Sequence, residues 1–149
     1  MKILIQRVAH ASVVVEGKTI GSIGPGAVVF FGATHGDSLN EIQWMANKLI
    51  NLRMFEDAQG KTNESLLDKK GEILIISQFT LYADCTVGRR PSFTQAAPPE
   101  LAKQLYSAFI AEVRNSGLVV QSGLFGAEMQ VSLLNEGPFT LCVERAPLH

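Results

Sequence analysis

Residues 72–79 read Glu72-Ile73-Leu74-Ile75-Ile76-Ser77-Gln78-Phe79 and carry the strongest signal for a buried strand in this chain. A short, continuous apolar run rich in β-branched residues predicts a strand that is covered on both faces. The run Ala27-Val28-Val29-Phe30-Phe31-Gly32, which follows a Gly-Pro-Gly turn, has the same character. We therefore expect two buried strands, one at residues 27–32 and one at residues 72–79.

Two segments predict amphipathic helices. Ser38 and Glu41 form a capping box ahead of apolar residues at helical spacing, so we expect a helix over residues 39–52. Pro98-Pro99-Glu100 starts a second helix, which Gly117 ends. The apolar side of this second helix repeats in i, i+4 steps through Leu101, Leu105, Phe109 and Val113.

Further strands are expected before, between and after these helices. Residues 3–8 and 12–15, followed by Ile20 and Ile23, predict an N-terminal hairpin that turns at Glu16-Gly17-Lys18. A short strand and turn are expected at residues 54–60, and three later strands at 118–122, 129–134 and 139–144. The order ββ-β-α-β-β-α-βββ predicts an α/β or α+β fold, a single layered domain over residues 1–149 with a mixed β-sheet and two main helices.

The composition limits the classes of protein that this chain can belong to. With 149 residues, of which 46% are hydrophobic and 18% are charged, we expect one globular domain. The net charge of −1 excludes a broadly basic surface for nucleic acids, so any RNA contact must come from a local patch. No apolar run approaches the roughly 20 residues that span a bilayer, and no secretory pattern is present, so we expect a cytoplasmic protein.

Metal and cofactor sites are not expected either. Cys85 and Cys142 are far apart and the three histidines are scattered, whereas a zinc site needs clustered ligands at short spacing. The G-x-S-x-G, P-loop and G-x-G-x-x-G motifs are absent. No histidine lies near Ser77 in sequence, so a Ser-His-Asp triad has little support. An enzyme of this sequence would depend on backbone dipoles and on positioning.

Three polar segments are candidates for a functional site. Ser77-Gln78-Phe79-Thr80 ends the most apolar strand, and its polar groups would either hold a substrate or only bond local backbone. Gly88-Arg89-Arg90-Pro91-Ser92-Phe93 would either bind phosphate and stack on a base or form a solvated loop. In Asn135-Glu136-Gly137-Pro138-Phe139-Thr140 the Gly-Pro pair favours an ordinary trans turn, because only about 5–6% of X-Pro bonds are cis.

Taken together, these segments resemble the D-aminoacyl-tRNA deacylase family, also called D-tyrosyl-tRNA deacylases. The resemblance extends essentially from end to end, with the blocks in matching order and spacing. These blocks are Gln6-Arg7-Val8, residues 23–26, 51–53, 77–83 and 88–93, Phe125-Gly126-Ala127-Glu128-Met129, and residues 135–140. Phe139, where the family often has Val, is the one small departure in these motifs.

The resemblance implies an esterase that hydrolyses D-amino acids, and also glycine, from the 3′ end of tRNA and rejects L-aminoacyl-tRNA. It implies a homodimer with two sites at the interface. The catalytic segment that would line the aminoacyl pocket is Ser77, Gln78, Phe79 and Thr80. The residues that would bind the substrate are a cis Gly137-Pro138 pair from the other protomer, Arg7, which would hold that pair, and Phe125, Gly126 and Met129 near the terminal adenosine.

Two mechanisms are open for such an enzyme. In one, the Thr80 hydroxyl is a nucleophile and forms an acyl-enzyme. In the other, the pocket backbone polarises the ester while the 2′-hydroxyl of the RNA assists water. We favour the second, because an unactivated hydroxyl is a poor nucleophile at neutral pH and Thr80 has no identifiable base. The alternative from another class is a non-catalytic dimer that binds RNA or a small molecule, against which the intact segments at Ser77 and Gly137 argue.

Overall fold

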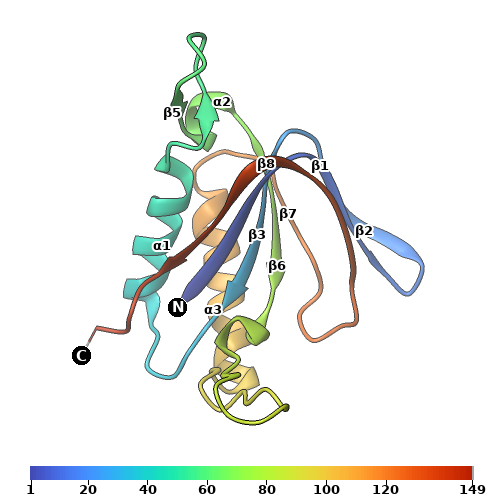
Figure 1. Ribbon diagram of the computed structural model, residues 1–149, viewed down its shortest axis with the longest axis vertical. Coiled ribbons are helices and arrows are strands. Elements are labelled where there is room, and N and C mark those ends of the chain that lie inside the picture. The colour runs from blue at the N-terminus through green and yellow to red at the C-terminus, as the bar shows by residue number, and fades with distance from the viewer. Residues whose placement is uncertain (149) are drawn as a thin grey trace.

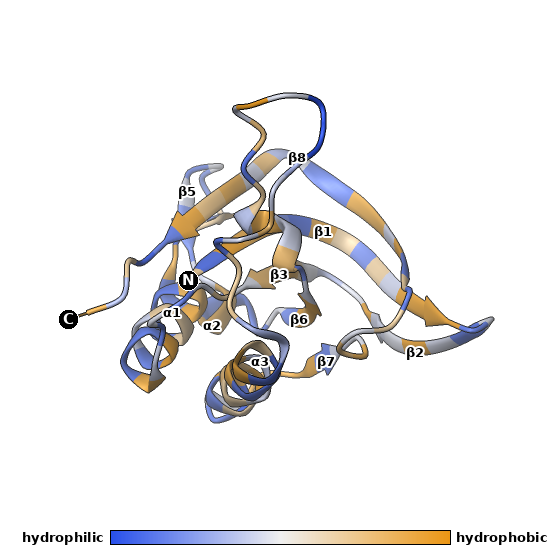
Figure 2. Ribbon diagram, turned by 90° about the horizontal axis from the view of Figure 1, so that it is seen from below, coloured by the Kyte–Doolittle hydropathy of each residue, from blue (hydrophilic) through white to orange (hydrophobic). Residues whose placement is uncertain are grey.

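In the computed structural model, which describes residues 1–148, a mixed six-stranded sheet is covered on one face by two long helices (Figures 1 and 2). The strands of this sheet are β1 (Lys2–Val15), β2 (Lys18–Ile23), β3 (Gly26–Gly32), β6 (Glu72–Ser77), β7 (Val120–Ser122) and β8 (Gln130–Glu144). Their order is β2-β1-β3-β6-β7, and β8 pairs antiparallel with β1. The helices are α1 (Leu39–Asn51) and α3 (Pro99–Arg114). The predicted mixed α/β fold is confirmed.

The two apolar runs form neighbouring parallel strands in the middle of this sheet. β3 and β6 pair in register from Gly26 with Glu72 to Phe31 with Ser77. Their alternate side chains point into two different hydrophobic clusters, one beneath the helices and one on the other face. Ile73 and Ile75 lie in the first cluster, and Leu74 and Ile76 in the second. Both faces of the strand are therefore covered, as the continuous apolar run predicts.

The second cluster exists because β1 is long and pairs on both sides. Its first half lies between β3 and β8, and its second half lies between β2 and β8. Val131 and Leu133 of β8 pack against Val8 and Val13 of β1 in this cluster. The β1–β2 hairpin turns at Glu16 and Gly17, both with positive φ, which is the geometry that two-residue hairpin loops favour. The predicted N-terminal hairpin is confirmed.

Both predicted helices are also confirmed. The capping box before α1 is complete, because Ser38 and Glu41 each bond the other residue's backbone N–H group. Helix α3 begins with Pro99 in its first turn, and Gly117, with φ of 85°, follows its end. None of the helices in the described residues is both long and apolar enough to cross a membrane.

The strand predicted for residues 72–79 ends earlier, at Ser77. The Gln78 N–H still donates to Phe31 O at 2.7 Å, but the chain then leaves the sheet and residues Phe79–Tyr82 form a single 3₁₀ turn, η1. The amide of Leu81 donates to Gln78 O and closes this turn. Local hydrogen bonding at Gln78 and Thr80 thus overrides the apolar pattern that continues to Phe79.

The two C-terminal strands predicted at residues 129–134 and 139–144 are one strand, β8, which carries a bulge between them. Because both halves pair with the same strand, β1, the ladder resumes after the bulge. A small hairpin of β4 (Phe55–Glu56) and β5 (Thr62–Glu64) and the short helix α2 (Leu66–Lys69) lie between α1 and β6. The strand-and-turn expectation at residues 54–60 covers only β4 and the start of this hairpin. Helix α2 has its own capping box, Ser65 with Asp68, which was not predicted from the sequence.

Candidate active site

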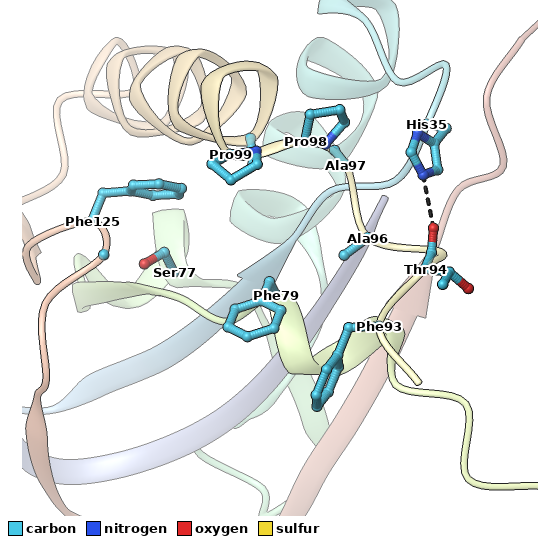
Figure 3. Close-up of a pocket in the computed structure, with 12 residues that line it drawn as sticks. His35, Ser77, Phe79, Phe93, Thr94, Ala96, Ala97, Pro98, Pro99 and Phe125 are labelled. Atoms are coloured by element: carbon cyan, nitrogen blue, oxygen red, sulfur yellow. Dashed lines mark hydrogen bonds between the residues drawn. The ribbon is translucent and has the colours of Figure 1, made fainter. Parts of the chain in front are cut away.

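A cavity of about 480 Å³ opens where β6 ends, between η1 and the start of α3 (Figure 3). This volume lies in the range of small-molecule sites. Most of its lining is apolar, with hydroxyl groups and one imidazole at separate points. The lining residues are His35, Ser77, Phe79, Phe93, Thr94, Ala96, Ala97, Pro98, Pro99, Ala102, Phe125 and Gly126. Four of the predicted site residues, Ser77, Phe79, Phe125 and Gly126, therefore share one cavity.

The turn η1 places the remaining residues of the predicted catalytic segment. The Gln78 amide donates to the Thr80 hydroxyl, and neither of these residues lines the cavity. In the described part of the chain, no carboxylate or imidazole bonds the Thr80 hydroxyl. The first N–H groups of a helical turn have no partner within that turn, and at this turn they belong to Phe79 and Thr80.

The aromatic rings at the cavity mouth come from two segments. The ring of Phe79 is 55% exposed and meets Phe93 edge-to-face, with their centroids 5.1 Å apart. Phe93 ends the basic segment that was predicted as a phosphate-binding candidate. This contact therefore joins the predicted catalytic segment to the predicted phosphate-binding segment. Edge-to-face pairs of this kind are favourable beyond simple burial.

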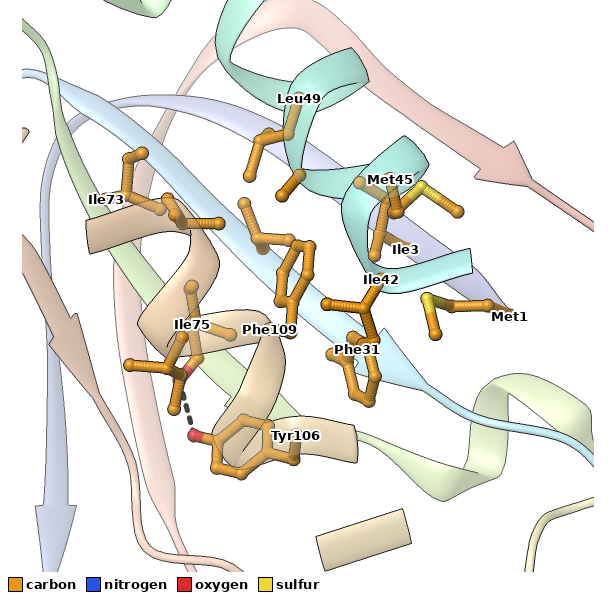
Figure 4. Packing of buried hydrophobic residues seen from close by; sticks show 14 of the residues in the cluster. Met1, Ile3, Phe31, Ile42, Met45, Leu49, Ile73, Ile75, Tyr106 and Phe109 are labelled. Atoms are coloured by element: carbon orange, nitrogen blue, oxygen red, sulfur yellow. Dashed lines mark hydrogen bonds between the residues drawn. The ribbon is translucent and has the colours of Figure 1, made fainter. Parts of the chain in front are cut away.

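A buried tyrosine of α3 contacts two of the elements that border the cavity. Tyr106 donates from its hydroxyl to Ile75 O at 2.8 Å (Figure 4), and its ring packs 6.0 Å from Phe125. Burial raises the pKa of Tyr106 to about 12, so the hydroxyl stays protonated and remains a donor. The same Ile75 carbonyl accepts from Gly123 N at 3.1 Å. The end of β6 and the segment that carries Phe125 are thus fixed to one another.

Several residues of the cavity carried no signal in the sequence. His35 comes from the loop after β3, and its Nε2 lies 2.9 Å from Thr94 O (Figure 3). Thr34 reinforces the same contact, because its hydroxyl donates to Gln95 O. The expectation that no histidine lies near Ser77 holds in sequence but not in space, since His35 and Ser77 line the same cavity. The structure shows no Ser-His hydrogen bond among the described residues.

A second group of predicted residues lies elsewhere. Arg7 and Gly137 line a different cavity of about 470 Å³, together with Phe55, Glu56 and Lys69 from β4 and α2. It shares no residue with the first cavity. In Figure 1, α2 and η1 lie at opposite ends of the sheet. The predicted substrate-binding residues of β8 are therefore remote from Ser77 within one chain.

The exposed segment Glu136-Gly137-Pro138 is held at Glu136 by the side chain of Arg7. Arg7 donates from Nε to Glu136 O at 3.1 Å and from Nη1 to Met54 O at 2.6 Å. Its guanidinium also lies 5.2 Å from the centre of the Phe139 ring. The Gly137–Pro138 peptide bond is cis. The trans turn that the general preference of X-Pro bonds favours is therefore wrong here, and the bond has the cis form that the family resemblance implies.

Met129 does not reach the cavity of Ser77. Its sulfur lies over Gly123, where a Cβ atom would approach to 2.5 Å, and the side chain packs against the second hydrophobic cluster. It lines a further cavity near the tip of the β1–β2 hairpin. Met129 is therefore separated from Phe125 and Gly126, with which the family resemblance grouped it.

The basic pair Arg89-Arg90 is exposed on a loop that leaves η1 and returns at Phe93. Two backbone hydrogen bonds between Asp84 and Ser92, of 2.8 and 2.9 Å, close the loop at its base. Asp84 uses its carboxylate to accept from the N–H and hydroxyl groups of Thr86. Within residues 1–148 neither arginine forms an ion pair, so both charges face solvent.

Residues 1–148 contain no group of three or more His, Cys, Asp or Glu side chains placed to hold a metal ion. The polar side chains among the residues that line the cavity are the hydroxyl groups of Ser77 and Thr94 and the imidazole of His35. Such groups can orient an ester and stabilise negative charge on its oxygen.

Comparison with known proteins gives one consistent family. Residues 4–144 match the family described as D-Tyr-tRNA(Tyr) deacylase. The D-aminoacyl-tRNA deacylase of Heliobacterium modesticaldum is 54% identical over 144 residues, which cover 97% of this chain and 96% of the relative. The corresponding protein of Thermosipho africanus is 53% identical, with 97% of each chain covered.

Solved structures that share the fold include the following two. The c-Myc DNA unwinding element binding protein superposes with a TM-score of 0.92 at 41% identity, covering 98% of this chain and 99% of that protein. A probable eukaryotic D-amino acid tRNA deacylase superposes with a TM-score of 0.80 at 20% identity, covering 95% and 97%.

Proposed function

The chain belongs to the D-Tyr-tRNA(Tyr) deacylase family, and on this basis we propose that it hydrolyses the ester that joins a D-amino acid to the 3′ end of tRNA. The observation that carries the proposal is the apolar cavity at the end of β6, with Ser77 in its wall and η1 beside it. The cavity has room for an amino acid side chain, and Phe79 of η1 is one of the residues that line it. The family resemblance assigns the aminoacyl group to this place.

The working enzyme is a homodimer in this proposal. Ser77 and Gly137 line separate cavities, and these lie at opposite ends of one sheet. One chain therefore does not bring its own β8 segment to its own cavity. A second copy supplies the segment, so that two equal sites form across a two-fold interface.

For the reaction, a water molecule attacks the ester carbonyl carbon and the bond from that carbon to the 3′ oxygen breaks. The 2′-hydroxyl of the terminal ribose takes part in moving the proton from the water to the departing 3′ oxygen. The Phe79 and Thr80 amides and Gln78 stabilise the charge that develops on the carbonyl oxygen. Loss of one such donor costs about 10²–10³ in rate in other enzymes. Thr80 is not a nucleophile here, because its hydroxyl partner is the Gln78 amide rather than a base.

Selection between mirror-image substrates depends on exclusion. A hydrophobic pocket discriminates one methylene by only about 1–3 kcal/mol, which is too little for strict stereochemical control. Gly137 and Pro138 from the partner would form a wall of backbone beside the substrate Cα. An L-side chain would clash with that wall whatever lies beyond its Cβ. Glycine has no Cβ and passes with the D-residues, so glycyl-tRNA is also a substrate.

The experiment that tests the function is multiple-turnover release of D-tyrosine from D-Tyr-tRNA, run with and without EDTA. We expect many turnovers per enzyme and equal rates in both arms, because residues 1–148 offer no ligand cluster for a catalytic metal. The competing function is a non-catalytic dimer that binds nucleic acid, which the name of one structural relative favours. Stoichiometric binding of the charged tRNA without release of D-tyrosine would support that function and contradict ours.

A further inference from the structure

The geometry points to Asn135 as a positioning residue that fixes the Gly137-Pro138 segment and so sets the discrimination between D- and L-aminoacyl-tRNA. This inference rests on the proposed role of that segment in the partner's site. Asn135 lies at the start of the bulge in β8, where the side chain is half-buried.

The bulge leaves the segment without the backbone bonds of a regular ladder. Gln6 of β1 pairs with Thr140, and Val8 pairs with Asn135. Four residues of β8, 136–139, therefore lie opposite a single residue of β1, Arg7. Bulges of this kind disrupt the ladder locally and re-aim the chain. Other groups must hold the four residues in one place.

The side-chain amide of Asn135 supplies the missing bonds. Its Nδ2 donates to Arg7 O at 2.9 Å and to Phe139 O at 3.1 Å. Both protons of the amide group are thus used, one on each strand. The amide oxygen lies on the other side, where a Cβ on Gly137 would be 3.3 Å from it.

Asn135 and Arg7 hold the two ends of the exposed segment separately. Arg7 donates to the carbonyl of Glu136 at the near end, and Asn135 donates to the carbonyl of Phe139 at the far end. Gly137 and Pro138 between them are exposed. The position of this pair relative to a partner therefore depends on both donors. Displacement of a reacting or excluding group by about 1 Å changes rates by about 10²-fold in enzymes.

Asn135→Asp is the substitution that tests the inference. Aspartate keeps the size of the side chain but removes both donors and places an anionic oxygen against two carbonyl oxygens. The control is Asn51→Asp on α1, because the Asn51 amide also donates to a backbone carbonyl four residues away, Asn47 O at 2.9 Å. Asn135→Ser, which retains one donor, is the intermediate variant.

The measured quantity is the ratio of kcat/KM for D-Tyr-tRNA to kcat/KM for L-Tyr-tRNA. The fraction of folded enzyme cancels in this ratio, so a merely structural role does not change it. We expect the ratio to fall by about tenfold or more in Asn135→Asp, to fall less in Asn135→Ser, and to stay at the wild-type value in Asn51→Asp. An unchanged ratio in both Asn135 variants, with equal losses on both substrates, would overturn the inference.

The same assay separates this inference from the proposed function. A wild-type enzyme that releases no D-tyrosine contradicts the proposed function and, with it, the role of Asn135. A wild-type enzyme that releases D-tyrosine selectively, together with Asn135 variants of unchanged selectivity, contradicts only the role of Asn135.

Discussion

The cavity at the end of β6 is held in shape mainly by packing of side chains, whereas the exposed segment of β8 is held mainly by hydrogen bonds to its backbone. The cavity is bounded by Ala102 of α3, by Ser77 and by Phe125. The buried Tyr106 contacts two of its borders, because it donates to Ile75 O and packs against Phe125. In the β8 segment, by contrast, Glu136, Gly137 and Pro138 are exposed. Side-chain donors hold its backbone from two sides, Arg7 at Glu136 and Asn135 at Phe139.

This difference determines what each region can do. Packing against a dense core resists movement, so the cavity keeps a fixed shape. At Gly137 and Pro138 the exposed segment presents backbone carbonyl groups and no flexible side chain. Such a segment is suited to entering another molecule's cavity and excluding a substituent there. In the proposed homodimer, each protomer carries one receiving region, the cavity at the end of β6, and one inserted region, the β8 segment.

The largest effect on the rate of hydrolysis is expected when the tRNA lacks the 2′-hydroxyl of its terminal ribose. A tRNA that ends in 2′-deoxyadenosine should be hydrolysed about 10²–10⁴-fold more slowly, because the hydroxyl that assists proton transfer is missing.

Thr80→Ala should keep turnover within about tenfold of wild type, since Thr80 only accepts a hydrogen bond from Gln78. Single-turnover rates with the two RNAs and two enzymes provide the comparison. Trapping an acyl group on Thr80 would instead establish covalent catalysis.

The second largest effect is the selectivity between D- and L-aminoacyl-tRNA, which the proposal assigns to the Gly137-Pro138 segment. D-Tyr-tRNA and Gly-tRNA should be hydrolysed readily, whereas L-Ala-tRNA and L-Tyr-tRNA should both be slower by more than about 200-fold, the upper range for discriminating one methylene. Small and bulky L-residues should be refused alike, because the clash occurs at Cβ. The measurement is kcat/KM for the four substrates. Ready hydrolysis of L-Ala-tRNA, or none of Gly-tRNA, would contradict a backbone wall.

A smaller difference from wild type, about twofold, should appear in a mixed dimer whose two protomers carry a defect in different regions. Ala96→Trp fills the receiving cavity, and Gly137→Trp places a bulky side chain on the inserted segment. Each homodimer should be inactive. A mixed dimer, purified through two different affinity tags, should recover about half of wild-type activity, because one of its two sites pairs an intact cavity with an intact segment. An inactive mixed dimer would show that each site is built within one protomer.

The smallest effect is expected at the basic loop beside the cavity. Replacing Arg89 and Arg90 with Ala should lower the slope of log K against log salt for tRNA binding by about 1 for each phosphate that the protein no longer neutralises. The matched control is Lys18→Ala with Lys61→Ala, which removes the same charge from two exposed positions on other hairpins. Equal slopes for the two double variants would place the RNA-binding surface away from this loop.

Much of the fold could be predicted from local sequence because the signals were local. The runs at residues 27–32 and 72–77 form the buried parallel strands, and the Ser38–Glu41 box starts α1. The predicted strand boundaries were wrong where a local hydrogen bond or pairing with a distant strand determined where the strand ends. Gln78 turns the chain away from the sheet, and β1 joins two predicted C-terminal strands into β8 by pairing with both. Neither event has a periodic signature in sequence.

The candidate site could be predicted only in part. Ser77, Phe79, Phe125 and Gly126 came from recognisable segments and do share a cavity. His35, Thr94 and the two prolines at the start of α3 line it as well, although nothing in their sequence context indicates a site. His35 and Thr94 are 59 residues apart in the sequence, and the contact between His35 Nε2 and Thr94 O brings their two loops together. The family resemblance groups Met129 with Phe125, but Met129 packs against the second hydrophobic cluster and lines a different cavity.

The sequence by itself determined the strand and helix periods, the two helix starts, the family and the absence of a general basic surface, because each depends on residues that are neighbours along the chain or on totals. The tertiary structure alone decided that Gly137 lies at the opposite end of the sheet from Ser77, and that Asn135 and Arg7 hold the segment between them. Those facts depend on the register between β1 and β8, whose paired residues are up to 142 positions apart. Register over such distances is set by the packing of both faces of the sheet at once, which no local pattern encodes.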